Sequence, residues 1–240
     1  MTDHDPTHDP AQYDAYADAY AEGNDDKPTH ALYERPAMLS LMPDVRGARV
    51  LDVGCGPGWY AAWLQAHGAS VVAFDAAEQF VRMTRERTGG RATVLRADLA
   101  QPLDFAADGE FAAVVCPLVL HYVEDWHAVM REFARVLRPG GVLVFSTHHP
   151  TMDWRLFERP DYFAAELVED EWDDVGRVTF YRRPLTDISA ALADAGFVIE
   201  RLLEPRLDDA FRRADPRAFE RWSPKPWFLF VRARREPHAW

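Results

Sequence analysis

The chain has 240 residues, of which 48% are hydrophobic and 28% are charged, proportions typical of one globular domain that buries a substantial core. Its formal net charge of -12 at pH 7 argues against a nucleic-acid partner, because such proteins neutralise phosphates with basic side chains. No apolar run approaches the roughly 18 to 20 residues that a membrane-spanning helix requires, so no membrane association is expected.

Two features bear on the compartment. The first ten residues are acidic and lack both the basic segment and the apolar core of a secretory signal. Cys55 and Cys116 are the two cysteines, too few for a disulfide framework or a four-ligand zinc site. Both are expected to be packing residues in a reducing compartment. We therefore expect a cytoplasmic location.

The first elements are predicted to be helical. Residues 11–22 are rich in alanine, and Tyr13, Tyr16 and Tyr20 fall on one face of the expected helix, because they are spaced three and four residues apart. Gly23 and Asn24 end this helix, and a second helix is expected over 30–41.

From residue 48 short β-branched runs alternate with longer helical ones. This alternation predicts a parallel sheet with helices on both faces, and the sequence Arg138-Pro-Gly-Gly141 is expected to turn the last of these helices into the next strand. The expected strands are 49–53, 70–74, 92–96, 111–116 and 141–145, and the expected helices are 59–67, 77–87 and 125–137.

The alternation breaks after Pro150. Residues 151–183 are rich in aromatic and acidic side chains and contain no clear crossover helix, so we expect an insertion over the sheet. A helix near 186–194 and strands at 196–200 and 227–231 follow. We expect the last two strands to pair antiparallel at the edge of the sheet.

A glycine-rich loop, Gly54-Cys-Gly-Pro-Gly58, follows the first strand directly. Glycines let the backbone turn sharply and approach a ligand closely. In open α/β sheets, ligands bind beyond the carboxyl ends of the strands. Asp75 ends the second strand, where a carboxylate meets the hydroxyls of an adenosine ribose, and Asp98 after the third strand is placed to face an adenine amine.

A nicotinamide-dependent oxidoreductase is the alternative for such a loop. Its G-x-G-x-x-G fingerprint requires glycine at position 59, where this chain has Trp59. Pro57 also removes an N–H donor that a pyrophosphate would need. Asp52 adds a negative charge, which suits a sulfonium and an ammonium better than phosphates. These residues disfavour the nicotinamide alternative.

On these residues the chain resembles the class I S-adenosylmethionine-dependent methyltransferases, in particular the quinone-methyltransferase-like group that acts on small molecules. The resemblance covers roughly residues 11 to 147 and implies an α/β fold with a doubly wound, Rossmann-like, seven-stranded sheet whose last strand is antiparallel. The matching stretches are Val50-Leu-Asp-Val-Gly-Cys-Gly-Pro-Gly58, Phe74-Asp75, Ala97-Asp98-Leu99, Leu120-His-Tyr-Val123 and Arg135-Val-Leu-Arg-Pro-Gly-Gly141.

The resemblance also implies a cofactor site and a domain organisation. Residues 1–44 would form a helical lid, and 45–240 the domain that binds S-adenosylmethionine and releases S-adenosylhomocysteine, with a substrate-side insertion over 150–183. The residues expected around the cofactor are Tyr13, Tyr20, Asp52, Gly54, Cys55, Gly56, Gly58, Asp75, Ala76, Phe80, Asp98, Leu99 and Cys116.

Candidate catalytic residues follow the fourth and fifth strands. Alignment of nucleophile, methyl group and sulfur supplies much of the acceleration of methyl transfer, and a base is needed only when the acceptor must lose a proton. His121, His148 and His149 are the candidate bases, because histidine titrates near neutrality. The related group often has Glu-His-Pro where this chain has His148-His149-Pro150, so His148 is the departure. No metal is expected, since adjacent residues of an extended chain point to opposite sides.

The sequence therefore predicts a methyltransferase that acts on an oxygen, nitrogen or carbon atom of a small metabolite, as a monomer or homodimer. The aromatic side chains over 154–181 either line an acceptor pocket or pack the insertion onto the sheet. A non-catalytic subunit that binds the cofactor is a further alternative, and the acidic charge disfavours methylation of proteins and nucleic acids.

Overall fold

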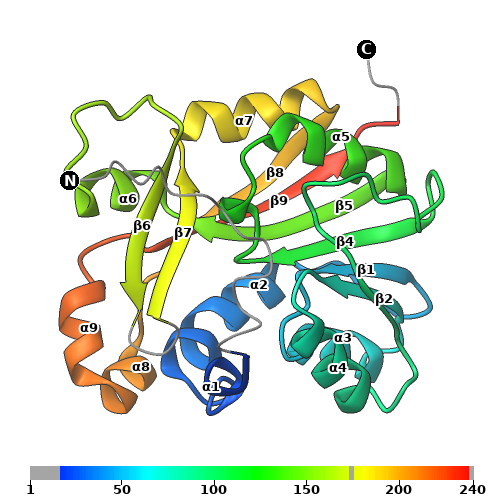
Figure 1. Ribbon diagram of the computed structural model, residues 1–240, viewed down its shortest axis with the longest axis horizontal. Coiled ribbons are helices and arrows are strands. Elements are labelled where there is room, and N and C mark those ends of the chain that lie inside the picture. Colours follow the sequence, from blue (N-terminus) through cyan, green and yellow to red (C-terminus); the bar gives the residue numbers. More distant parts are fainter. Residues whose placement is uncertain (1–16, 173–175, 238–240) are drawn as a thin grey trace, which may run out of the picture.

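The computed structural model describes residues 17–172 and 176–237. Its main sheet has seven strands in the order β3-β2-β1-β4-β5-β9-β8 (Figure 1). The first five strands are mutually parallel, whereas β9 runs antiparallel to both of its neighbours. The predicted fold is therefore confirmed, including its antiparallel last strand. The strands are β1 Arg49–Val53, β2 Ser70–Asp75, β3 Thr93–Arg96, β4 Phe111–Pro117, β5 Leu137–His148, β8 Phe197–Leu203 and β9 Phe228–Arg235.

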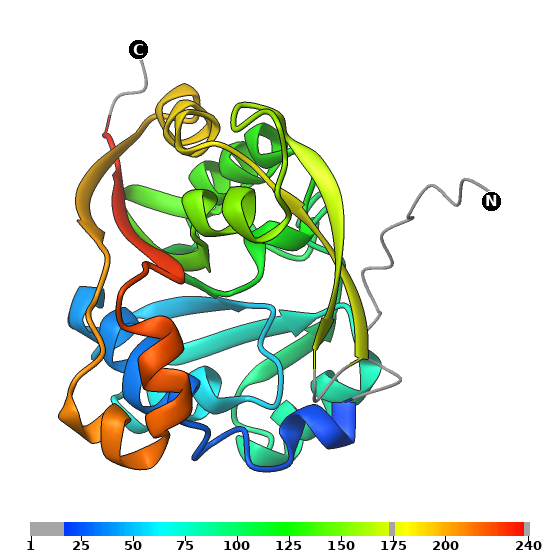
Figure 2. The same cartoon turned by 90° about the vertical axis from the view of Figure 1, so that its left-hand side faces the viewer.

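Helices cover both faces of this sheet, and each face has its own apolar core (Figure 2). On one face lie α5 (Trp126–Val136) and α7 (Leu185–Asp194). On the other lie α2 (Arg35–Leu41), α3 (Trp59–Ala66) and α4 (Glu78–Arg87). In α5 the buried side chains recur every three or four residues, the spacing that places them on one helical face.

The N-terminal region is helical, as predicted, but not uniformly α-helical. Its described part begins with α1 (Ala17–Ala21), continues through the π-helical segment η2 (Thr29–Glu34) and passes directly into α2. Tyr13 and Tyr16 lie outside the described residues. Met38 and Leu41 of α2 are buried in the core of the sheet domain, so this helix is part of that core.

Two expectations for the later part of the chain are corrected. The segment after Pro150 holds regular structure, namely α6 (Pro150–Leu156) and an antiparallel hairpin of β6 (Glu166–Trp172) and β7 (Gly176–Arg182). The acidic side chains of β6 hide its strand pattern in the sequence. The last two strands pair as expected, but α8 (Asp209–Ala214) and α9 (Pro216–Trp222) connect them, and neither helix was predicted.

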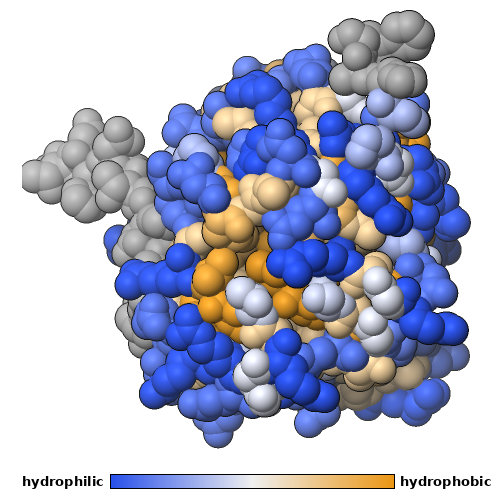
Figure 3. Space-filling model, turned by 90° about the vertical axis from the view of Figure 1, so that its right-hand side faces the viewer, coloured by the Kyte–Doolittle hydropathy of each residue, from blue (hydrophilic) through white to orange (hydrophobic). Residues whose placement is uncertain are grey.

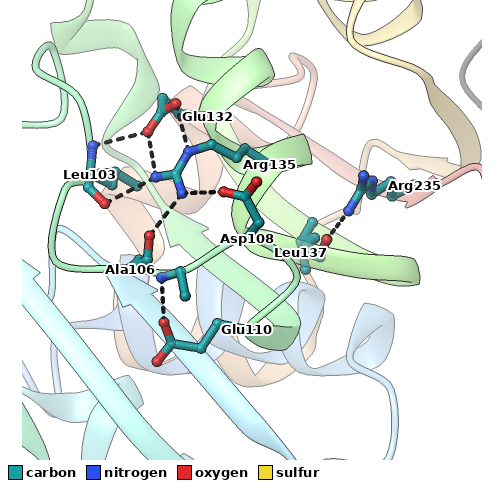
Figure 4. A network of polar contacts seen from close by, with 9 residues as sticks. Leu103, Ala106, Asp108, Glu110, Glu132, Arg135, Leu137 and Arg235 are labelled. Atoms are coloured by element: carbon teal, nitrogen blue, oxygen red, sulfur yellow. Dashed lines mark hydrogen bonds and ion pairs between the residues drawn. The ribbon is translucent and has the colours of Figure 1, made fainter.

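Residues 138–141 do not separate α5 from the next strand, because β5 already begins at Leu137. Just before it, Arg135 fixes the preceding crossover (Figure 4). Its guanidinium donates to the Asp108 carboxylate at 2.9 Å and to the Ala106 carbonyl at 2.8 Å, and it pairs with Glu132 at 2.8 Å. Arg135, the first residue of the stretch 135–141 on which the family resemblance partly rests, therefore contacts the crossover and not the glycine loop.

In Figure 1 the arrowheads of β4 and β5 point left, so the right-hand side lies at the amino ends of these strands. Figure 3 shows that this side is largely hydrophilic, with a small hydrophobic area at its centre. Within residues 17–172 and 176–237, no helix has the length and apolar character needed to cross a membrane.

Candidate cofactor-binding site

A pocket lies at the carboxyl ends of β1, β2, β3 and β4, where the sequence placed it. It is bordered by the glycine loop, by the acidic residues that end or follow β2 and β3, and by the segment that follows β4. Tyr20 of α1 closes one side. The lining residues are Tyr20, Gly54, Gly56, Phe74, Asp75, Ala76, Phe80, Ala97, Asp98, Leu99, Pro117, Leu118, Val119, Tyr122 and Val123.

The three glycines of the loop all have positive φ, but their surroundings differ. A Cβ atom on Gly54 would lie 2.3 Å from Val119 Cγ2, and one on Gly58 would lie 2.9 Å from the Thr84 backbone. A Cβ atom on Gly56 would meet nothing within 4 Å. Gly54 and Gly58 therefore allow close packing inside the protein, whereas Gly56, which lines the pocket, has open space around the position of a Cβ atom.

Asp75 holds the loop and its own turn. Its Oδ2 accepts the amide hydrogen of Gly56 at 2.9 Å, and its Oδ1 accepts that of Ala77 at 3.0 Å. Asp98 makes a similar local bond, because its Oδ1 accepts from the amide of Ala100 at 2.9 Å. Both carboxylates thus have their orientation set by backbone donors and border the same pocket.

The ionisation state of Asp52 differs from the negative charge that the sequence predicted. Its side chain is fully buried beneath the loop. Burial raises its pKa to about 8, and the nearby Asp75 carboxylate adds to this effect. Among the described residues, neither carboxyl oxygen of Asp52 has a hydrogen-bond partner. At pH 7 the Asp52 carboxyl is therefore mostly protonated in this structure, and the expected negative charge is absent.

Aromatic and aliphatic side chains form the remaining walls. Tyr20 and Phe80 meet edge to face with ring centroids 5.6 Å apart, a favourable arrangement of aromatic rings. Leu118 adopts a positive φ of 54°, which is costly for a leucine. Its amide donates to the Ser146 carbonyl and to the Ser146 hydroxyl, at 3.0 and 3.1 Å. Sequence reasoning missed Leu118 and Val119, because no local signal marks a strained leucine.

The candidate histidines lie near the pocket but do not line it. The rings of His121 and His148 stack with centroids 4.0 Å apart. Burial lowers the pKa of His148 to about 3, so its imidazole is neutral. His149 instead caps α6, where its Nδ1 accepts from Thr151, while its Nε2 lies 2.7 Å from Glu204.

Four residues expected beside the cofactor also lie outside the lining, namely Asp52, Cys55, Gly58 and Cys116. Both cysteines are free and buried, and burial raises the pKa of each thiol. Across the described part of the chain, no group of three or more histidine, cysteine and acidic side chains could hold a metal ion.

Known proteins are similar to this chain in both sequence and fold. Residues 51–145 match the family model described as a methyltransferase domain. The ubiquinone biosynthesis O-methyltransferase of Xanthomonas oryzae pv. oryzae is 39% identical over 149 residues, which cover 61% of this chain. The chain spans 59% of the length of that relative.

Two solved structures extend the likeness. An S-adenosylmethionine dependent methyltransferase from Mesorhizobium loti is 30% identical, with a TM-score of 0.70 over 86% of this chain and 99% of that one. The N-methyltransferase NodS from Bradyrhizobium japonicum, in complex with S-adenosylhomocysteine, is 16% identical and shares the fold, with a TM-score of 0.62 over 94% of this chain and 98% of that one.

The seven-stranded sheet and the pocket at its glycine loop define a class I Rossmann-like methyltransferase fold. The chain belongs to the S-adenosylmethionine-dependent methyltransferases, the family whose cofactor is S-adenosylmethionine.

Proposed function

We propose that this protein transfers the methyl group of S-adenosylmethionine to an oxygen, nitrogen or carbon atom of a small molecule. The observation that carries the proposal is the pair of carboxylates, Asp75 and Asp98, oriented by backbone amides around the open space beside Gly56. This pair of acceptors fits a ribose and an adenine, which offer hydroxyl and amine donors to carboxylates.

In this proposal each wall of the pocket has one task. Gly54 and Gly56 border the methionine and ribose portion, and Asp75 with Ala76 holds the ribose hydroxyls. Asp98 and the Leu99 backbone meet the adenine, whose ring packs between apolar side chains. Tyr20 and Phe80 supply that packing, and Tyr20 is the lid residue. Asp52, Cys55, Gly58 and Cys116 support the loop from behind.

When bound, S-adenosylmethionine supplies an electrophilic methyl group on a sulfonium. The chain's own contribution is then to align the acceptor and to exclude water, and alignment is worth about 7 to 11 kcal/mol in well-oriented systems. Leu118, Val119 and Tyr122 form the wall on the acceptor side. This mostly apolar wall supports a small molecule with an apolar body, and the relatives named O-methyltransferases favour oxygen as its acceptor atom.

A base role for His121, His148 or His149 stays a prediction, and the geometry does not favour it. His148 is buried with a pKa lowered to about 3, so its affinity for a proton at neutral pH is low. His149 already uses Nδ1 to cap a helix. We propose that the stacked pair, His121 and His148, packs behind Tyr122 and shapes the acceptor wall.

Calorimetry with S-adenosylmethionine and S-adenosylhomocysteine tests the cofactor site directly. We expect micromolar binding of both, severe weakening in Asp75→Ala, and wild-type affinity in Asp44→Ala, which removes an exposed carboxylate outside the pocket. If a nicotinamide cofactor binds tightly and neither S-adenosylmethionine nor S-adenosylhomocysteine binds, the proposal is contradicted.

A library of small metabolites, assayed for S-adenosylhomocysteine release, separates an enzyme from a non-catalytic subunit that only binds the cofactor. The net charge of -12 supports a metabolite over a nucleic-acid or membrane acceptor. We further propose a cytoplasmic location and a monomer or homodimer. Cell fractionation tests the location, and light scattering in solution tests the oligomeric state.

A further inference from the structure

Two sets of hydrogen bonds, one ending on Glu34 and one starting on Arg35, lie behind the pocket and reach two of its walls. One wall is Tyr20 of α1, and the other is Leu118 after β4. The two sets meet at the end of η2, whose last residue is Glu34. The Glu34 side chain is buried but lines no part of the pocket. None of the sequence patterns singles out this glutamate.

The first set of hydrogen bonds leads from Glu34 to the acceptor wall. The Ser146 hydroxyl donates to Glu34 Oε1 at 3.1 Å. Ser146 in turn accepts the Leu118 amide on both its hydroxyl and its carbonyl oxygen. A leucine at positive φ persists only where its surroundings hold it. Ser146 provides that hold, and Glu34 fixes the hydroxyl of Ser146.

The second set leads from Arg35 to the lid residue, and the backbone between residues 34 and 35 links it to the first set. Arg35, the next residue, is buried and donates to Asn24 Oδ1 at 2.8 Å. A side-chain hydrogen bond joins Asn24 to Tyr20. The Arg35 guanidinium also lies over the Trp59 ring, 4.5 Å from its centroid, so the backbone at 34–35 is fixed from both sides.

A third contact reaches the helix that follows the glycine loop. The Tyr60 hydroxyl, in the first turn of α3, donates to Glu34 Oε2 at 2.8 Å. A buried carboxyl costs stability unless it is fully hydrogen-bonded, and an apolar side chain would pack there without that cost. The carboxyl instead gives directional contacts to α3, the helix that follows the glycine loop, and to Ser146 of β5, which holds Leu118 of the pocket lining.

We propose that Glu34 is a positioning residue that couples the N-terminal segment 17–35 to the acceptor wall, so that Tyr20 and Leu118 take their positions together. The identity of the bound cofactor in this inference rests on the proposed function. The mechanical coupling does not, because every contact in it lies within the protein.

Hydrogen–deuterium exchange on the full chain tests the coupling without any ligand. In Glu34→Gln we expect exchange to rise about threefold to tenfold both in 17–25 and in 118–123, the factor that corresponds to one lost hydrogen bond. Ser146→Ala, a smaller change that leaves Glu34 and Tyr60 in place, should raise exchange in 118–123 by a similar factor.

The matched control is Glu132→Gln, which removes a carboxylate of the Arg135 network on another part of the fold. It should raise exchange over 103–110 and leave both pocket walls at the wild-type rate. Wild-type exchange over 118–123 in folded Glu34→Gln would overturn the coupling. A uniform rise across the chain would overturn it as well, because it would indicate only a less stable fold.

Calorimetry with S-adenosylhomocysteine supplies the second readout. Glu34→Gln and Ser146→Ala should each weaken binding about threefold to tenfold. The double variant should bind as tightly as the single variant of lower affinity, since both substitutions break the same set of hydrogen bonds. Additive losses would contradict the coupling. Failure of the wild-type protein to bind would instead contradict the proposed function, and the exchange experiment would still decide the coupling.

Discussion

The amide of Gly56 donates a hydrogen bond of 2.9 Å to Oδ2 of Asp75. This bond joins the glycine loop after β1 to the carboxyl end of β2, so the two features that the sequence placed side by side hold each other. It also means that Asp75 has two tasks, because the carboxylate assigned to the ribose also fixes the loop beside it.

The two tasks of Asp75 can be separated by Asp75→Asn. Asparagine keeps the side-chain volume and an acceptor oxygen for one backbone amide, but it loses the charge that strengthens hydrogen bonds to ligand hydroxyls. We expect S-adenosylhomocysteine to bind roughly tenfold to a hundredfold more weakly, which corresponds to about 1.4 to 2.7 kcal/mol, the size of one charge-assisted hydrogen bond. The melting temperature should change little. Unchanged affinity by calorimetry would remove Asp75 from the ribose site.

Gly58→Ala tests the packing of the loop against α4. The new Cβ atom would lie 2.9 Å from the backbone of Thr84, and Gly58 has a φ of 85°. The Thr84 backbone cannot move away from the new Cβ atom as easily as a flexible side chain could. In addition, the left-handed backbone conformation costs a non-glycine residue about 1 to 2 kcal/mol. We expect a loss of unfolding free energy of roughly 2 to 4 kcal/mol, measured by urea denaturation. Gly56→Ala, where a Cβ atom meets nothing, should lose only the backbone part and serves as the control.

Asp52 predicts how stability depends on pH. Its pKa is raised from 3.8 to about 8 in the folded protein, so between these values the folded state binds more protons than the unfolded state. The free energy of unfolding therefore falls as the pH rises through this window, by at most about 1.4 kcal/mol per pH unit from this group. Asp52→Asn should lose less stability than wild type between pH 5 and pH 8. Parallel pH curves for the two proteins in chemical denaturation would show that Asp52 is not protonated in the fold.

Arg135→Met tests the network that holds the crossover before β4. Methionine keeps much of the side-chain length but takes the guanidinium donor away from the Ala106 carbonyl, the Leu103 carbonyl and the Glu132 carboxylate. The Leu103 carbonyl and the Glu132 carboxylate each keep one backbone donor. We expect a loss of about 1 to 3 kcal/mol in the free energy of unfolding, with S-adenosylhomocysteine affinity unchanged, because the network lies away from the pocket lining. A selective loss of affinity in a protein of normal stability would contradict this structural role.

The sequence predicted the sheet and the cofactor loop well because both depend on local signals. β-Branched runs alternating with helical ones predicted the order of the elements, and β1 was predicted with its observed bounds of Arg49–Val53. The position of Asp75 at the end of β2 followed from strand length alone. The hairpin of β6 and β7 was missed, because its acidic strand shows no clear alternation of buried and exposed residues.

Side-chain environment was harder to predict, and Asp52 and His148 show why. Both were expected to act through charge or proton transfer near neutral pH. Each is enclosed by segments distant in sequence, and burial disfavours the charged form of each, raising the pKa of Asp52 and lowering that of His148. Desolvation depends on what surrounds a group from every side, and a sequence pattern carries little of that information.

The glycine loop and the positions of Asp75 and Asp98 at the carboxyl ends of β2 and β3 were therefore determined by the sequence itself, since short-range propensity and a parallel sheet fix where those residues fall. Only the tertiary structure decided the acceptor wall and the role of Glu34. The bonds from Glu34 to Tyr60 and Ser146 span 26 and 112 positions. Contacts of such separation arise from how the N-terminal segment packs against the sheet, and no local pattern along the chain specifies them.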